Sequence, residues 1–191
     1  MHIYLYDLVE GSCRQLTSGE WVVRAIEYWD EVQRRLYFSA AGREQPGVVD
    51  PYLRHLYSIS VDEPNALPTL LTPEPADHAI TFSPNGKWFT DSYSRADLPT
   101  VAVLRDSADG RVLLRLEAAD LEPLLATGWN MPQPFVTTAP DGVTQLYSLF
   151  WPPHHAGGDE NNNIMDNKAE LPDSTVPVLE NIYTGPHSVS A

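Results

Sequence analysis

A strand–turn–strand unit that occurs twice in the first 116 residues constrains the fold of this chain more than any other feature. In the first copy Ala25-Ile26 is followed, after a polar turn, by residues 36–38 (LYF). In the second copy Ala79-Ile80 is followed, after Ser-Pro-Asn-Gly, by residues 88–89 (WF). Alternating aromatic and β-branched residues are typical of half-buried strands, and Asn-Gly tolerates the positive φ that closes a hairpin. Repeated units of short antiparallel strands predict blades of a β-propeller.

Nine short strands are expected before residue 117, separated by turns and loops rich in Gly, Pro, Asn and Asp. They cover residues 2–8, 13–17, 22–28, 35–40, 53–61, 79–82, 88–93, 101–105 and 112–116. About two blades and the last strands of a preceding one fit here, which is too few to close a ring. We therefore expect the chain to be a fragment. A single irregular β-sandwich is the alternative that the pattern leaves open.

The sequence changes in character after residue 116. Residues 118–126 (AADLEPLLA) predict a short helix, and residues 135–138 and 145–151 predict a hairpin around Asp141-Gly142. Residues 154–175 are polar and acidic, which is typical of an exposed loop, and residues 176–183 (VPVLENIY) predict a last strand.

Composition excludes several classes of protein. Twelve Lys and Arg against 26 Asp and Glu give a net charge of −14, which would repel a nucleic-acid backbone. The sequence has no apolar run of the length of a membrane span and no signal-peptide pattern near Met1. The single cysteine, Cys13, excludes an internal disulfide and a cysteine-built metal site, and we expect it to be a small buried residue.

Motif searches point to no cofactor. No serine lies in a G-x-S-x-G frame, so the chain holds no recognisable nucleophile. The phosphate-binding motifs G-x-x-x-x-G-K and G-x-G-x-x-G do not occur either, so no nucleotide site is predicted. His154, His155, Asp159 and Glu160 could be imagined as metal ligands. Because adjacent residues on an extended loop point apart, we favour a solvated acidic loop and predict no metal. His55 and His78 are expected to be packing or surface residues rather than ligands.

Seven aromatic residues recur along the predicted strands and could form either a ligand platform or a core. Their alternation favours the core between neighbouring blades. They are Tyr28, Trp29, Tyr37, Phe38, Phe82, Trp88 and Phe89.

Tyr183 is the one candidate catalytic residue. It ends the last predicted strand and is followed at once by Thr184-Gly185-Pro186, where the chain would leave a sheet. A phenol at such a strand end could donate a hydrogen bond to a developing oxyanion. A tyrosine of the core or the sheet rim is the alternative for this residue taken alone.

Several segments, in this order, resemble the late propeller blades of dipeptidyl peptidase IV and the entry into its hydrolase domain. They are residues 16–21 (LTSGEW), 36–39 (LYFS), 55–57 (HLY), 82–87 (FSPNGK), 91–94 (DSYS), 139–142 (APDG), 151–154 (WPPH) and 177–187 (PVLENIYTGPH). Residues 157–175 depart from the family pattern as a longer and more acidic insertion.

The resemblance implies a mainly β fold in three parts. Residues 1–117 would form the terminal blades of a β-propeller, residues 118–134 a connector with a short helix, and residues 135–191 the first strands of a truncated α/β-hydrolase domain. The resemblance also implies a family whose members commonly dimerise, and a periplasmic or secreted location.

For activity, the resemblance implies a serine exopeptidase that removes N-terminal dipeptides with proline or alanine in the second position. Tyr183 would be its side-chain oxyanion donor. The catalytic serine, aspartate and histidine would lie after Ala191, and the acidic pair that binds the substrate's amino group would lie before Met1. We therefore expect the 191-residue chain alone to be inactive. The alternative function is a non-catalytic propeller module that binds proteins.

Overall fold

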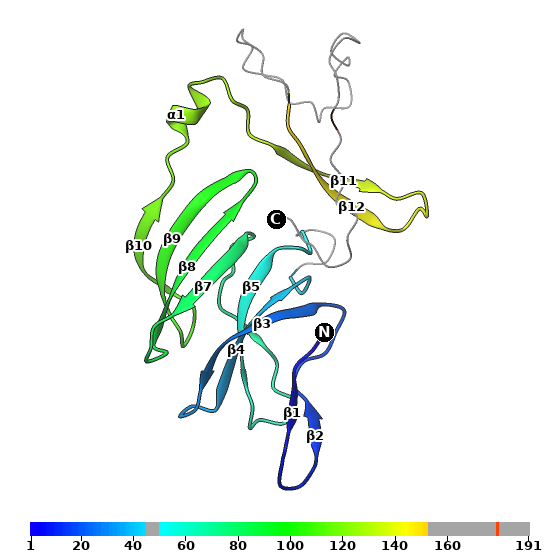
Figure 1. Ribbon diagram of the computed structural model, residues 1–191, viewed down its shortest axis with the longest axis vertical. Coiled ribbons are helices and arrows are strands. Elements are labelled where there is room, and N and C mark those ends of the chain that lie inside the picture. Colours follow the sequence, from blue (N-terminus) through cyan, green and yellow to red (C-terminus); the bar gives the residue numbers. More distant parts are fainter. Residues whose placement is uncertain (45–49, 153–178, 180–191) are drawn as a thin grey trace.

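The computed structural model describes residues 1–44, 50–152 and 179 and contains twelve strands and one short helix in these residues (Figure 1). The first six strands are β1 (Tyr4–Tyr6), β2 (Cys13–Gln15), β3 (Val22–Asp30), β4 (Arg35–Ala41), β5 (Arg54–Ser60) and β6 (Thr69–Leu70). They are followed by β7 (Asp77–Phe82), β8 (Trp88–Arg95), β9 (Leu98–Asp106), β10 (Val112–Ala118), α1 (Glu122–Leu125), β11 (Gln133–Thr138) and β12 (Gln145–Phe150).

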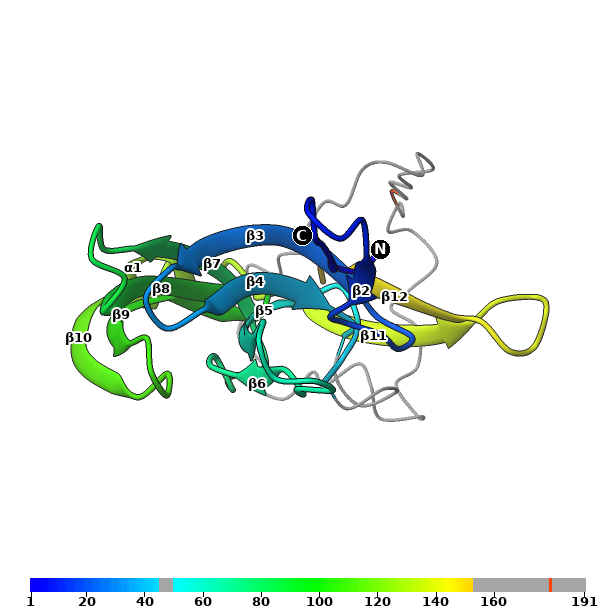
Figure 2. The same cartoon turned by 90° about the horizontal axis from the view of Figure 1, so that it is seen from below.

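The strands form two four-stranded antiparallel sheets and two hairpins. The first sheet has the order β3-β4-β5-β6 and the second the order β7-β8-β9-β10, while β1–β2 and β11–β12 each form a two-stranded sheet. The β1–β2 hairpin lies on the side of the first sheet that faces away from the second, as Figures 1 and 2 both show. Successive sheets of four consecutive antiparallel strands are the architecture of propeller blades, as the repeat predicts.

The first sheet is covered on both faces. On one face Val23, Phe38 and Ile59 form a core with Ile3, which precedes β1. On the other face Tyr37 and Leu56 form a second core with residues of the second sheet and of the segment that joins the sheets. Strands β4 and β5 are consequently buried along almost their whole length.

The two sheets contact each other through aromatic rings. The Phe82 ring lies 4.9 Å from Tyr28, 5.0 Å from Tyr37 and 5.3 Å from Phe89, measured between centroids. Gly86 closes the β7–β8 turn with φ +66, as the Asn-Gly pair predicts. A side chain at Gly86 would also overlap the Tyr28 ring, so this glycine serves the contact between the sheets as well as the turn.

Trp29 and Trp88 correct the prediction that all seven aromatics lie in the core between blades. They are 38% and 45% exposed, because their phase in β3 and β8 directs them away from the contact between the sheets. Cys13 is also exposed, contrary to expectation, since β2 belongs to a two-stranded hairpin rather than to a sandwiched sheet.

The predicted helix at 118–126 is shorter in the structure. The ladder between β9 and β10 extends to the pair Ala118↔Val101, and the amide of Ala119 donates to the carbonyl of Thr100, so the strand occupies the first part of that segment. Helix α1 keeps only Glu122–Leu125, with all four residues exposed.

Two other predictions of strands differ in extent. The strand expected at 2–8 is reduced to Tyr4–Tyr6, because the Asp7 carboxylate accepts hydrogen bonds from the amides of Val9 and Glu10 and starts a turn. Strand β6 was not expected from its two residues. The strand predicted at 176–183 falls outside the described residues apart from Leu179.

Candidate functional site at the contact between the two sheets

Most of the sites considered in the sequence lie outside the described residues. Tyr183 does so, and so do His154, His155, Asp159 and Glu160. Within residues 1–44, 50–152 and 179, no group of three or more His, Cys, Asp or Glu side chains could hold a metal ion. No helix in that part of the chain is long and apolar enough to cross a membrane.

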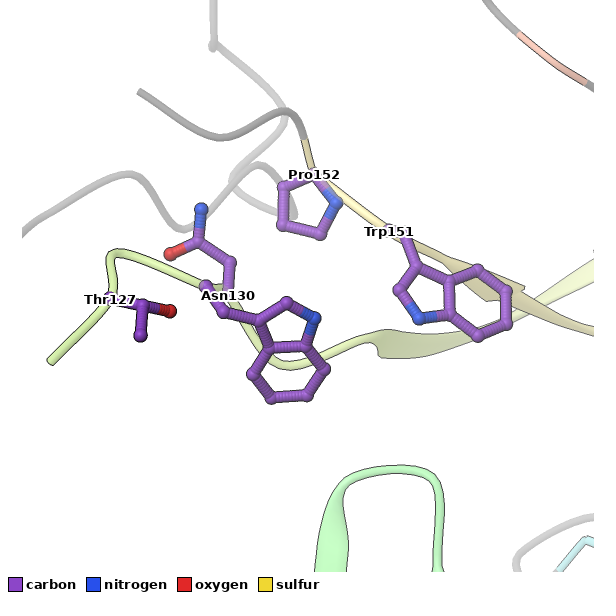
Figure 3. A pocket seen from close by; sticks show the side chains of 5 residues that line it. Thr127, Asn130, Trp151 and Pro152 are labelled. Atoms are coloured by element: carbon purple, nitrogen blue, oxygen red, sulfur yellow. The ribbon is translucent and has the colours of Figure 1, made fainter. Parts of the chain in front are cut away.

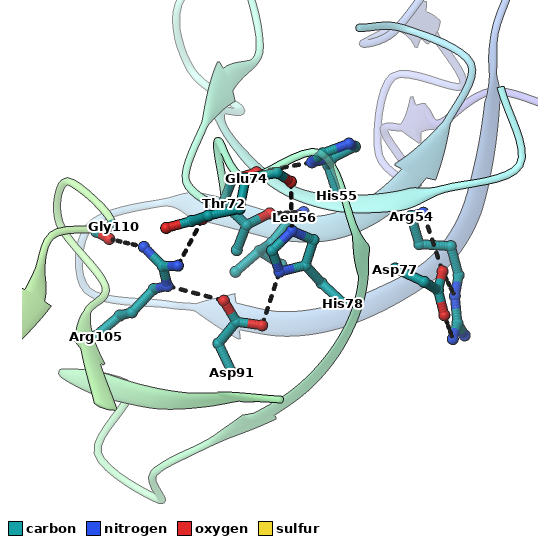
Figure 4. Close-up of polar contacts among 10 residues, drawn as sticks. All are labelled: Arg54, His55, Leu56, Thr72, Glu74, Asp77, His78, Asp91, Arg105 and Gly110. Carbon is teal, nitrogen blue, oxygen red and sulfur yellow. Dashed lines mark hydrogen bonds and ion pairs between the residues drawn. The ribbon is translucent and has the colours of Figure 1, made fainter. Parts of the chain in front are cut away.

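A buried ion cluster lies where the two sheets meet, centred on Asp91 of β8 (Figure 4). One carboxylate oxygen, Oδ2, accepts a hydrogen bond of 2.8 Å from Nε of Arg105 on β9. The other, Oδ1, lies 2.8 Å from Nδ1 of His78 on β7. The side chains of Asp91 and His78 are 0% exposed and that of Arg105 is 2% exposed. The charges of Asp91 and Arg105 therefore neutralise one another with little help from water.

The cluster extends to the linker that joins the sheets, residues 71–76. Nη2 of Arg105 donates to Oε2 of Glu74 at 2.7 Å, and Nη1 donates to the carbonyl of Gly110 at 2.9 Å. Nε2 of His78 lies 3.0 Å from the carbonyl oxygen of Glu74. Burial raises the pKa of Glu74, but the hydrogen bond from Arg105, a backbone hydrogen bond and the nearby positive charge together outweigh it, so the pKa is lowered overall. The linker is thus fixed to the second sheet by charge.

Strand register explains how these side chains converge. In the β7–β8 ladder Asp91 is opposite Ile80, so His78 is its diagonal neighbour on the same face. In the β8–β9 ladder Asp91 is opposite Val103, which makes Arg105 a diagonal neighbour too. The sequence contains a signal of this cluster that was missed: Asp91 and Arg105 share the inward phase of Phe89 and Val103. A charge at a core phase predicts a buried partner.

A second set of contacts fixes the linker and the start of β7 to the first sheet. The side chain of Arg54 donates to the Asp77 carboxylate, with 2.8 Å between Nε and Oδ1. Burial raises the pKa of Asp77, but its hydrogen bonds from Arg54 lower it overall. Nδ1 of His55 lies 2.7 Å from the carbonyl oxygen of Thr72, and the Thr72 hydroxyl accepts from the amide of Leu56. His55 and His78 are thus packing residues, as expected, with specific polar partners.

A third polar contact lies on the other face of the first sheet. The Tyr57 hydroxyl donates to Oε1 of Glu44 at 2.9 Å, and the guanidinium of Arg43 lies 5.0 Å from the centre of the Tyr57 ring. Burial raises the pKa of the Tyr57 phenol, and the charge of Glu44 adds to this effect. The phenol is therefore a protonated donor at neutral pH.

A cavity of about 280 Å³ lies between the connector and the β11–β12 hairpin (Figure 3). Its described lining consists of Thr127, Trp129, Asn130, Trp151 and Pro152. None of these side chains is titratable, so they offer apolar surface and hydroxyl, indole and amide hydrogen-bonding groups but no acid or base.

The ion cluster cannot carry out catalysis in its observed form. A His–Asp pair can act as a base only when the imidazole reaches a substrate or a nucleophile. Both ring nitrogens of His78 already face protein oxygens, and its side chain is fully buried. Together with the contacts of Arg54 and His55, the cluster connects the two sheets through the linker. We take this structural connection as its role.

Comparisons with known proteins agree on one family. The sequence model of the dipeptidyl peptidase IV N-terminal region matches residues 1–100. Dipeptidyl peptidase 4 of Trichophyton tonsurans is 28% identical over 155 residues, which is 80% of this chain and 19% of that protein. A probable dipeptidyl peptidase 4 of Trichophyton verrucosum is 33% identical over 98 residues, 51% of this chain and 12% of that protein.

Solved structures give the same result for the fold. The crystal structure of Porphyromonas gingivalis dipeptidyl peptidase 4 matches 80% of this chain with a TM-score of 0.63 and 25% identity. A putative dipeptidyl aminopeptidase IV from Bacteroides ovatus matches 76% of the chain with a TM-score of 0.55 and 21% identity, which supports the fold alone. The match covers 20% of the length of either solved chain.

Proposed function

This chain belongs to the dipeptidyl peptidase IV N-terminal-region family, and on that premise we propose that it is the part of a serine exopeptidase that joins the propeller to the catalytic domain. The observation that carries the proposal is the family match over residues 1–100. These residues include the β1–β2 hairpin, the first sheet, and strands β7 and β8 of the second sheet with the start of β9. The relative from Trichophyton tonsurans extends the similarity over 155 residues of the chain.

The proposed division of labour follows the chain. Residues 1–117 would contribute the last blades, residues 118–134 the connector, and residues 135–191 the beginning of an α/β-hydrolase domain. The end of β10 at Ala118, the short helix α1 and the start of β11 at Gln133 support these boundaries. In such an enzyme the substrates would be peptides with proline or alanine in the second position. The subunits would form homodimers.

Tyr183 is the proposed contribution of this chain to the chemistry. Attack on the scissile carbonyl places negative charge on its oxygen, and a donor aimed at that oxygen stabilises the transition state more than the ground state. A phenol, with an ordinary pKa near 10, is a protonated donor at neutral pH. The nucleophile, its base and the orienting carboxylate would come from residues beyond this chain.

The proposal is tested with the full-length protein and a chromogenic Xaa-Pro substrate. We expect release of the chromophore, and no release when the substrate's amino group is acetylated, because an exopeptidase requires the free amine. The 191-residue chain alone, which lacks a G-x-S-x-G motif, should be inactive. Equal cleavage of free and acetylated substrates would contradict an exopeptidase. A full-length protein without any hydrolysis would favour the protein-binding module.

The role of Tyr183 has its own test. Tyr183→Phe in the full-length enzyme should lower kcat by about 10²–10³, the usual cost of losing one oxyanion donor. KM should change little, since the lost hydrogen bond forms mainly in the transition state. A folded Tyr183→Phe enzyme with unchanged kcat would remove Tyr183 from the mechanism and leave the family relationship intact.

A further inference from the structure

The ring of His78 faces a hydrogen-bond acceptor at each of its two nitrogens. Nδ1 lies 2.8 Å from Oδ1 of Asp91, and Nε2 lies 3.0 Å from the carbonyl oxygen of Glu74. A neutral imidazole carries one N–H, and its other nitrogen is an acceptor. The carbonyl oxygen of Glu74 has no hydrogen to donate. Oδ2 of Asp91 accepts a hydrogen bond from Arg105, so this carboxylate acts as an acceptor through both of its oxygens. Both contacts of His78 are hydrogen bonds only when both nitrogens carry hydrogen.

The charges around His78 balance in that state. Two cations, His78 and Arg105, then oppose two carboxylates, the buried Asp91 and the partly exposed Glu74. Buried charges persist in proteins when they are paired and hydrogen-bonded in this way. With a neutral His78 the buried cluster would keep one excess negative charge.

The other charged and titratable groups near His78 fit the same state. The centre of the His55 ring on β5 lies 5.2 Å from the centre of the His78 ring. Nδ1 of His55 faces the carbonyl oxygen of Thr72, and this contact needs only one N–H on the ring. Burial lowers the pKa of His55, and the charge of His78 lowers it further. Asp77 of β7 is paired with Arg54, and the Tyr93 ring of β8 packs 5.3 Å from His78.

We propose that His78 is a buried imidazolium that completes a charge-neutral clamp between the second sheet and the linker 71–76, so that the contact between the two sheets weakens as the pH rises. When His78 loses a proton, one nitrogen presents a lone pair to an oxygen and one hydrogen bond is lost. The stabilisation is present at low pH and disappears on the alkaline side.

His55 gives the opposite dependence. The folded state favours the neutral form of His55, because its pKa is lowered there. Its contribution to the stability of the fold is therefore present above the ordinary histidine pKa and is lost as the pH falls through the lower pKa of the folded state. One charged and one neutral histidine side by side therefore give a curve of stability against pH that falls on both the acidic and the alkaline side of a maximum.

The protonation state can be observed directly in the 191-residue chain labelled with ¹⁵N-histidine. Long-range ¹⁵N–¹H correlation spectra at about pH 7, near the ordinary titration range of histidine, should show two protonated nitrogens for His78 and a single protonated Nδ1 for His55. The His78→Gln variant identifies the signal by its loss. A single neutral tautomer of His78 at this pH would overturn the proposal, and this measurement on the wild-type chain does not depend on the stability of any variant.

The consequence for stability is measured by urea unfolding as a function of pH. Between about pH 6 and about pH 9, the range in which an imidazolium loses its proton, the unfolding constant of the wild-type chain should rise by roughly tenfold or more, the effect of one charge-assisted hydrogen bond. His78→Gln should abolish this rise. His55→Gln should keep it and remove the acidic limb.

His2→Gln is the matched control, since His2 lies next to the β1–β2 hairpin and contacts Thr17 and Gly19 rather than the cluster. This variant should retain the alkaline rise of the wild-type chain. An alkaline rise that survives in His78→Gln, or that disappears in His2→Gln, would contradict the assignment to His78.

Discussion

The first sheet, β3–β6, is covered on both faces, whereas the second, β7–β10, is covered on one. In β4 and β5 almost every residue is buried, but in β8 burial alternates between inward Phe89 and Asp91 and outward Trp88 and Thr90. Strand β10, at the edge of the second sheet, is exposed along nearly its whole length. Two sheets of the same connectivity thus differ in burial because they differ in the number of neighbours that pack against them.

The covered faces also differ in chemistry. The core between the first sheet and the β1–β2 side is built from aliphatic and aromatic residues. The contact between the two sheets adds an ion cluster to its aromatic rings. The hydrogen bonds of the charged groups depend on distance and direction, so they add a directional contact to the apolar packing between the sheets.

The largest expected effect comes from Asp91→Ala. Removal of this carboxylate leaves Arg105 and His78 buried without their main counter-charge, which should destabilise the chain by about 3–5 kcal/mol in urea unfolding. The matched control is Asp62→Ala, which breaks the exposed ion pair with Arg34 and should leave the unfolding curve unchanged. Equal unfolding midpoints for the two variants would show that the cluster does not hold the sheets.

The difference in burial is tested by the same substitution in both sheets. Leu56→Ala, at a residue of β5 that is 0% exposed, should cost about 2–5 kcal/mol because it leaves a cavity in the core. Leu114→Ala, at a residue of β10 that is 56% exposed, should change the unfolding free energy by less than about 0.5 kcal/mol. A large effect at Leu114 would mean that another surface covers β10 in solution.

Two glycines with positive φ allow the cost of the backbone conformation to be separated from the cost of a contact with another segment. Gly110 has φ +77 and a Cβ there would lie 2.7 Å from Cα of Leu71 in the linker, whereas Gly142 has φ +74 and open space around it. Gly142→Ala should cost about 1–2 kcal/mol for the backbone conformation alone. Gly110→Ala should have the same backbone cost and a further cost of about 1–3 kcal/mol, because the new methyl group displaces the linker. Thermal unfolding of the two variants compares them, and equal costs would remove the linker contact from the explanation.

The smallest effect concerns the exposed β11–β12 hairpin, which depends on local hydrogen bonds. The Thr144 hydroxyl and the amides of Val143 and Thr144 donate to Asp141 and lower its pKa to about 2. Because the folded pKa is depressed, this stabilisation is present above the ordinary value and is lost as the pH falls through about 2. Thr144→Val should raise the pKa of Asp141 in an NMR titration of its carboxyl carbon. An unchanged titration would contradict the role of the hydroxyl.

Much of the fold could be predicted from residue patterns, and most of the candidate site could not. Alternation located three strands of the first sheet and all four of the second, and Asn85-Gly86 and Asp141-Gly142 marked hairpin turns with positive φ at the glycine. The helix was overestimated because its first residues pair with β9, a contact between distant segments that helical propensity does not contain. The ion cluster was missed because its members are separated by up to 31 residues in the sequence.

The sequence by itself determined the strands, the tight turns and the order of segments that resembles the dipeptidyl peptidase IV family, because these depend on neighbouring residues and on side-chain period. Tertiary structure alone decided which faces are covered. It exposed Cys13, Trp29 and Trp88, and it buried Asp91 and Arg105 as partners. The physical reason is that burial and charge pairing are properties of what packs against a strand, and those contacts come from segments that are distant in the sequence.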